Sequence, residues 1–111
     1  MEHAELCAAL AGALAQSKAR YEEARHDPFD SHVYAAEAEA LEELCQSLRD
    51  GLSAEALAAR QQTMLPELEQ AMAEELEHPT FDWYGEHYHY LRLKGRLAAW
   101  RAVRELLEPD A

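Results

Sequence analysis

The chain has 111 residues, which fits one domain, and 49% of them are hydrophobic, enough to bury a core. Acidic residues outnumber basic ones 22 to 10, and the resulting formal charge of −12 disfavours generic binding to nucleic acid or to an anionic membrane. Four glycines and four prolines supply too few turns for a β-sandwich or a β-barrel.

The first predicted helix spans roughly 2–26. Apolar residues recur at three- and four-residue steps from Leu6 to Tyr21, which is typical of a helix that packs one face against a neighbour. Asp27-Pro28 ends this helix, because the residue before a proline avoids the helical backbone conformation.

A second helix is predicted over roughly 31–50. Asp30 and Ser31 have side chains that can cap its first turn. Gly51 is placed to end it, since glycine readily adopts the left-handed conformation that follows many helices.

The third predicted helix spans roughly 54–78 and is capped by Ser53. Pro66 lies inside it, where it either kinks one helix or starts a second piece near Leu65. We expect the second arrangement, a helix broken near Pro66.

The last predicted helix spans roughly 82–107, with Thr80 or Asp82 as its N-cap. It has two apolar faces, and such a helix is either central in its own fold or shared with a second subunit. Its length of ~39 Å is more than the shorter helices can easily cover on both faces. We therefore expect a homodimer through this helix. The expected dimer contacts are Leu93, Leu97, Trp100 and Leu107.

These segments predict an all-α fold, a compact bundle of four main helices. Residues 1–108 form a single helical domain, and residues 109–111 form a C-terminal tail. The apolar run at 6–15 lacks the basic start of a signal peptide, and no run reaches the ~20 residues of a membrane span. Cys7 and Cys45 form no CxxC pair, so we expect reduced thiols in a cytoplasmic protein.

Glutamates gather on the second and third predicted helices. Residues four apart on a helix are ~6 Å apart, close to the ~7 Å between phosphates along a DNA strand. Such faces can imitate a phosphate track and enter a basic cleft, or they only keep the protein soluble. The glutamates expected to contact a partner are Glu37, Glu39, Glu42, Glu43, Glu67, Glu74 and Glu75.

Aromatic residues cluster where the last predicted helix begins. Such clusters form core or dimer contacts, or they anchor a partner protein, because Tyr and Trp are enriched in binding hot spots. The residues expected to act as an anchor are Trp83, Tyr84 and Tyr88.

Basic and small residues follow the aromatic cluster. Residues 92–104 carry five bases and no acids, which suits the C-terminal half of a helix or pairing with glutamates nearby. The alternative is a basic patch that binds an acidic partner or nucleic acid, although the overall charge disfavours nucleic acid. Gly95, Ala98 and Ala102 form a stripe of small residues that permits close approach of another helix.

Catalytic and metal-binding patterns are sparse. No nucleophile elbow, phosphate-binding glycine loop or zinc spacing is present, so we expect a non-enzymatic protein without a cofactor. Two Glu-x-x-His spacings match the pattern of di-iron helix bundles, but both histidines precede proline turns at helix ends. These weak metal candidates are Glu23, His26, Glu75 and His78.

Residues 88–107, a tyrosine-bearing helix with a Gly-Arg step at Gly95-Arg96, resemble a helix of small phage and prophage accessory proteins. The composition also resembles anti-CRISPR and DNA-mimic inhibitors. The resemblance implies a phage or mobile-element origin. We expect a non-enzymatic accessory protein that acts by binding another protein, in its most concrete form an inhibitor of a host nucleic-acid-binding machine. The Glu-rich faces would engage a basic cleft of that machine, and the aromatic cluster would anchor the contact. A phage structural or assembly protein is the first alternative, and a metal-binding helical bundle is the second.

Overall fold

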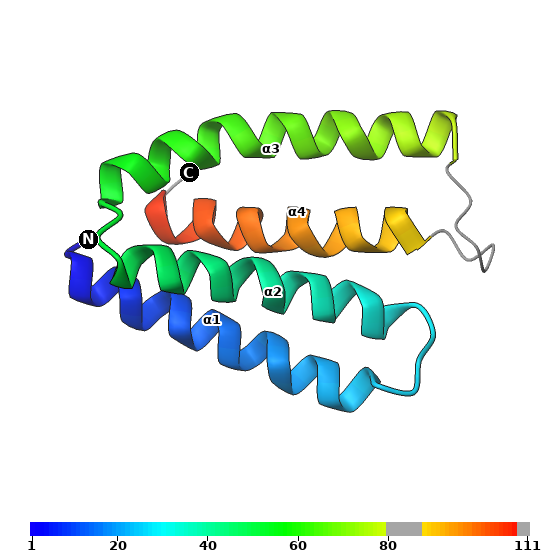
Figure 1. Ribbon diagram of the computed structural model, residues 1–111, viewed down its shortest axis with the longest axis horizontal. Coiled ribbons are helices and arrows are strands. Elements are labelled where there is room, and N and C mark those ends of the chain that lie inside the picture. Colours follow the sequence, from blue (N-terminus) through cyan, green and yellow to red (C-terminus); the bar gives the residue numbers. More distant parts are fainter. Residues whose placement is uncertain (80–87, 109–111) are drawn as a thin grey trace.

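The computed structural model describes residues 1–79 and 88–108, and four helices take up most of these residues (Figure 1). They are α1 (His3–Ala24), α2 (Asp30–Arg49), α3 (Ala54–Glu77) and α4 (Tyr88–Leu107). No strand occurs in the two described stretches, so the prediction of an all-α helical fold is confirmed. None of the four helices is both long and apolar enough to cross a membrane.

The two central helices are α2 and α4, which pack against each other along their lengths. Figure 1 shows α1 on the outer side of α2 and α3 on the outer side of α4. Each central helix is therefore covered on two sides by neighbours from the same chain.

This central position explains the two apolar faces of α4. Gly95 lies against α2, while Trp100 lies beside Ala59 and Met64 of α3. The expected dimer residues Leu93, Leu97 and Trp100 are all buried inside one chain, and Leu107 packs partly buried against the same core. A single chain thus accounts for the pattern on which the homodimer rested, and the homodimer stays a prediction.

Large, fully buried side chains gather at the end of the bundle where α1 begins and α4 ends (Figure 1). There the first half of α1 and the second half of α4 meet the end of α2 and the start of α3. The most deeply buried side chains at this end include Leu6, Leu10, Leu48, Leu57 and Val103. At the opposite end, several large apolar side chains remain exposed.

The start of α2 is capped from the preceding turn. The Asp27 carboxylate accepts hydrogen bonds from the backbone N–H groups of Phe29 (2.8 Å) and Asp30 (2.9 Å). The two hydrogen bonds, that of Asp30 first, lower the pKa of Asp27. The expected capping role of Asp30 and Ser31 is therefore wrong, because the side chain that accepts the capping hydrogen bonds is that of Asp27.

The turn between α2 and α3 forms as predicted. Gly51 has a φ of 109° and donates its N–H to the Leu48 carbonyl at 3.2 Å, while Leu52 donates to the Ser47 carbonyl at 2.9 Å. These two bonds make a Schellman motif, which requires a left-handed residue at Gly51. Ser53 then caps α3, its hydroxyl accepting the Ala56 N–H at 3.1 Å.

Helix α3 runs continuously through Pro66, so the predicted break into two pieces is wrong. Pro66 is exposed, and its ring removes only one backbone hydrogen bond from a helix of 24 residues. Leu65 and Leu68, on either side of it, are buried in the core and hold both halves of the helix in place.

Candidate interaction site

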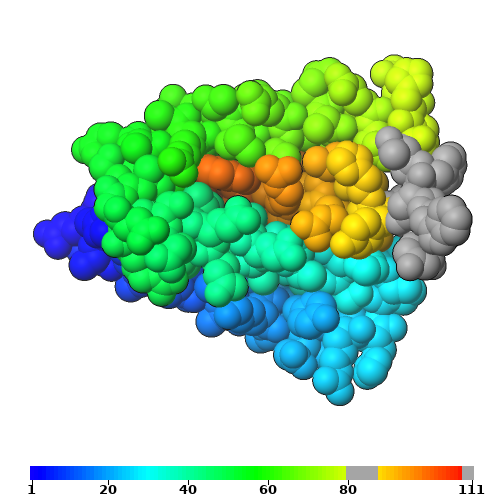
Figure 2. All heavy atoms as spheres, viewed as in Figure 1, coloured from blue at the N-terminus to red at the C-terminus, as the bar shows by residue number. Residues whose placement is uncertain are grey.

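A groove runs over α4 between α2 and α3 and is visible as the recessed strip in Figure 2. Its first hollow, of about 330 Å³, lies between α2 and α4. The lining residues there are Ala36, Glu39, Ala40, Glu43, His89, Arg92, Leu93 and Arg96. A second hollow, of about 620 Å³, is lined by His89 and by Gln70, Ala71, Glu74, Glu75, Glu77 and His78 of α3. Because His89 lines both hollows, we treat them as one site and call it the α4 groove.

The helical repeat explains what each helix contributes. On α2, Ala36 and Ala40 are four residues apart, and their small side chains leave space above α4. Glu39 and Glu43 repeat at the same interval and place carboxylates along this wall. The groove therefore has an acidic wall on α2, an acidic wall on α3 and a basic floor.

Arg92 links the floor of the groove to its wall and to an aromatic ring. Its guanidinium lies 2.7 Å from the Glu39 carboxylate and donates to the Tyr88 hydroxyl at 3.3 Å. The hydrogen bonds to Glu39 and then to Tyr88 raise the pKa of Arg92, since both favour the charged form. Tyr88 in turn makes an edge-to-face contact with His32, with ring centroids 4.9 Å apart.

Two charged residues of the α4 groove, Arg96 and Glu43, take part in no ion pair among the described residues. Glu74 accepts a hydrogen bond from Gln70 at 3.1 Å but pairs with no base in the described part of the chain. Both walls therefore offer carboxylates that a basic partner can reach.

The glutamates expected to bind a partner divide into those that line the α4 groove, those that are exposed outside it, and the enclosed Glu37. The α4 groove is lined by Glu39, Glu43, Glu74 and Glu75. Glu75 is almost buried there, since it is only 5% exposed. Glu67 is exposed on α3, about two helical turns before Glu74, and Glu42 is exposed on α2 outside the lining.

Glu37 does not fit the expectation that it faces a partner. It is only 8% exposed, and its carboxylate lies 3.5 Å from the guanidinium of Arg20 in α1. The seam between α1 and α2 encloses Glu37, so the structure gives it an internal ion pair rather than a free acidic face.

The end of the bundle next to the α4 groove carries exposed apolar side chains. Tyr88 is 37% exposed, Phe29 is 55% exposed and Leu76 is 66% exposed. Of the expected anchor, Trp83 and Tyr84 lie outside the described residues. No signal in the sequence marks Phe29 or Leu76 as exposed, because exposure of a single apolar side chain depends on which neighbouring helices cover it.

The weak metal candidates are not brought together. Glu23 and His26 lie at the end of α1, while Glu75 and His78 lie at the end of α3. The α2–α4 pair separates these two helices (Figure 1). Within residues 1–79 and 88–108, no group of three or more His, Cys, Asp and Glu side chains is placed to hold a metal ion.

Comparisons with known proteins add no relative: no family model, no curated protein and no solved structure matches the chain. Its function therefore has to be argued from the α4 groove, the distribution of charge and the exposed aromatic side chains. The groove, its charged lining and the exposed aromatic side chains lie together toward the end of the bundle where α4 begins.

Proposed function

We propose that this chain is a non-enzymatic accessory protein, of phage or mobile-element type, that inhibits a nucleic-acid-binding protein by occupying its basic cleft. The observation that carries the proposal is that glutamates from two helices far apart in the sequence line one groove. Glu39 and Glu43 stand on α2, and Glu74 and Glu77 stand on α3.

Electrostatics favours a basic partner at this site. The chain carries a formal charge of −12, which raises the local concentration of cations and speeds encounter with a basic surface. The ion pair between Arg92 and Glu39 is open to solvent, with the two side chains 36% and 59% exposed, and so contributes little stability. A partner's arginine can replace Arg92 at Glu39 without a large penalty.

The exposed aromatic end supplies the second part of the contact. Tyr88 touches Arg92 and His32, so its ring is held in one orientation beside the α4 groove. Phe29 and Leu76 add apolar area at the same end. Anchoring by rigid aromatic side chains next to charged groups is the usual composition of a binding hot spot.

The proposal is tested by affinity capture from host lysate, followed by salt elution and identification of the bound protein. The captured protein is then purified and its binding to DNA or RNA is measured with and without this chain. We expect competition that weakens as salt increases. Recovery of only the chain itself or of virion components would overturn the inhibitor function and favour a role in assembly.

A matched pair of variants isolates the role of the α4 groove. The triple variant Glu39→Gln, Glu43→Gln and Glu74→Gln should weaken binding at least about tenfold and flatten its salt dependence. The control variant carries Glu5→Gln, Glu23→Gln and Glu105→Gln. These three glutamates are exposed away from the α4 groove, so the control changes the net charge by the same amount. Equal losses in both variants would show that only total charge matters, and the groove assignment would be discarded.

A further inference from the structure

The two cysteines approach each other across the seam between α1 and α2. His3 reaches the Leu48 carbonyl at 3.0 Å, and the Ser17 hydroxyl donates to the Tyr34 carbonyl at 3.4 Å. These contacts pair the start of α1 with the end of α2, so the turn that holds Cys7 lies opposite the turn that holds Cys45. Cys45 is part of the buried core, and Cys7 packs partly buried against that core.

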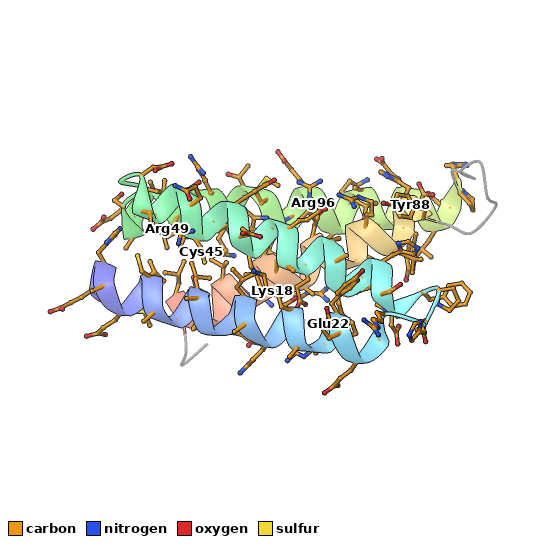
Figure 3. All side chains as sticks on the ribbon, turned by 60° about the horizontal axis from the view of Figure 1, so that its bottom comes forward. Lys18, Glu22, Cys45, Arg49, Tyr88 and Arg96 are labelled. Atoms are coloured by element: carbon orange, nitrogen blue, oxygen red, sulfur yellow. The ribbon has the colours of Figure 1, made fainter. Side chains whose placement is uncertain are left out.

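Figure 3 marks this seam by Cys45 and Arg49 on α2 and by Lys18 on α1. Both thiols are free in the structure. Cys7 is close enough to Cys45 for a charge on one thiol to influence the other.

His3 is placed to act as a base toward Cys7. The Cys7 Sγ lies 3.8 Å from His3 Nδ1, and the other ring nitrogen, Nε2, lies 3.0 Å from the Leu48 carbonyl. A carbonyl only accepts hydrogen bonds, so in the neutral ring Nε2 carries the proton and Nδ1 offers a lone pair to the thiol. A nucleophile, a base and a group that orients the base are thus aligned.

The two thiols differ in accessibility. Cys7 is half-buried and His3 is exposed, so a small molecule can reach them. Cys45 is buried, and this desolvation raises the pKa of its thiol, with the neighbouring Cys7 adding to the shift. A reagent from solution therefore reacts with Cys7 first, because Cys45 is buried and its raised pKa favours the protonated thiol.

We propose that Cys7 is a reactive thiol, activated by His3, that accepts a low-molecular-weight disulfide, and that Cys45 resolves the product into a Cys7–Cys45 disulfide. This site is separate from the α4 groove and does not depend on the function proposed above.

The reaction proceeds by two thiol–disulfide exchanges. In the first, His3 Nδ1 takes the Cys7 proton, and the Cys7 thiolate attacks one sulfur of the reagent. A bond forms between Cys7 Sγ and that sulfur, the bond between the two reagent sulfurs breaks, and the departing thiolate takes the proton from His3. In the second, the Cys45 thiol loses its proton and its thiolate attacks Cys7 Sγ. The bond between Cys7 Sγ and the reagent's sulfur breaks, and the other half of the reagent leaves as a thiolate that takes up this proton. Two protein thiols are oxidised, and one disulfide is reduced to two thiols.

The test treats the reduced full-length chain with oxidised glutathione and follows the products by mass spectrometry. We expect an intact chain lighter by two hydrogens and, after trypsin digestion, one disulfide joining the peptides of Cys7 and Cys45. With Cys45→Ala, the mixed disulfide on Cys7 should accumulate instead. A persistent mixed disulfide in the unaltered chain, or disulfide-linked dimers, would overturn the proposal.

The role of His3 is tested by the rate of the first step. His3→Gln keeps a side chain that can donate to the Leu48 carbonyl but removes the base, so we expect the modification of Cys7 to slow at least about tenfold. His26→Gln is the control, because His26 is exposed at the far end of α1, and it should leave the rate unchanged. Equal rates for His3→Gln and the unaltered chain, with circular dichroism showing both folded, would remove His3 from the site.

Discussion

Gly95 of α4 and Ala36 of α2 meet where the two central helices pack together, and a Cβ atom on Gly95 would lie 2.8 Å from that of Ala36. The same atom would lie 2.9 Å from the backbone nitrogen of Glu37 and would overlap the Val33 carbonyl oxygen. Because these are backbone and Cβ atoms of a helix, they cannot move aside unless α2 itself shifts.

The variant Gly95→Ala should therefore lower the free energy of unfolding by about 1–3 kcal/mol, through overpacking between α2 and α4. Gly12→Ala is the matched control, since Gly12 is exposed within α1 and nothing lies within 4 Å of the added carbon. That change should raise stability by about 0.5–1 kcal/mol, because alanine favours helix over glycine. Urea unfolding followed by circular dichroism measures the free energy of unfolding of both variants. A change of the same sign in Gly95→Ala and Gly12→Ala would contradict overpacking at Gly95.

Arg20→Gln should destabilise the chain by about 1–2 kcal/mol, because it leaves the enclosed Glu37 carboxylate without its cation. Arg25→Gln provides the comparison. Its partner Glu22, at 3.7 Å, is exposed, so the loss there should stay within about 0.5 kcal/mol. Thermal unfolding of the two variants would settle the difference, and equal effects would mean that enclosure of Glu37 has no energetic consequence.

Pro66→Ala should raise the free energy of unfolding by about 1–3 kcal/mol. Alanine restores a backbone N–H to the interior of α3, and the exposed proline ring gives up no core contact. Pro79→Ala, beyond the end of α3, should change stability little. A loss of stability in Pro66→Ala would mean that the proline shapes α3 in a way that the fold requires.

Asp27 should make stability depend on pH at the acid end. Its pKa is lowered in the folded chain by the backbone N–H groups of Asp30 and Phe29, so its contribution is fully present above the unfolded value. The contribution is lost as the pH falls below about 4 and passes through the folded-state pKa. Asp27→Asn keeps a capping side chain that does not titrate. Its thermal unfolding midpoint should therefore fall less steeply than that of the unaltered chain as the pH is lowered from about 5 to about 3. Parallel curves for the two proteins would exclude this role of Asp27.

Local signals made the helices predictable. Pro28, Gly51 and Ser53 act on the residues beside them, and the structure ends or starts helices where those residues indicate. The choice of Asp27 over Asp30 as a cap was harder, since both have suitable side chains and only the path of the turn decides between them.

Features that depend on a neighbouring helix could not be read from the chain alone. Glutamate is a residue type typical of the surface, and Glu37 becomes enclosed only because α1 packs over it and places Arg20 beside it. The two apolar faces of α4 allowed either a second subunit or a central place in the fold, and sequence periodicity does not distinguish these. The α4 groove requires α2 and α3 to stand on either side of α4, an arrangement that no motif encodes.

The uneven core has a consequence for how the chain opens. Leu6, Leu48 and Leu57 are fully buried at the end where α1 begins, whereas Leu76 and Tyr88 are exposed at the other. Amide hydrogen exchange should therefore be slowest around Leu48 and Leu57 and become faster along α3 toward His78. The acidic walls of the α4 groove would then lie on the part of the bundle that unfolds locally most often. Binding of a partner should slow amide hydrogen exchange in that part.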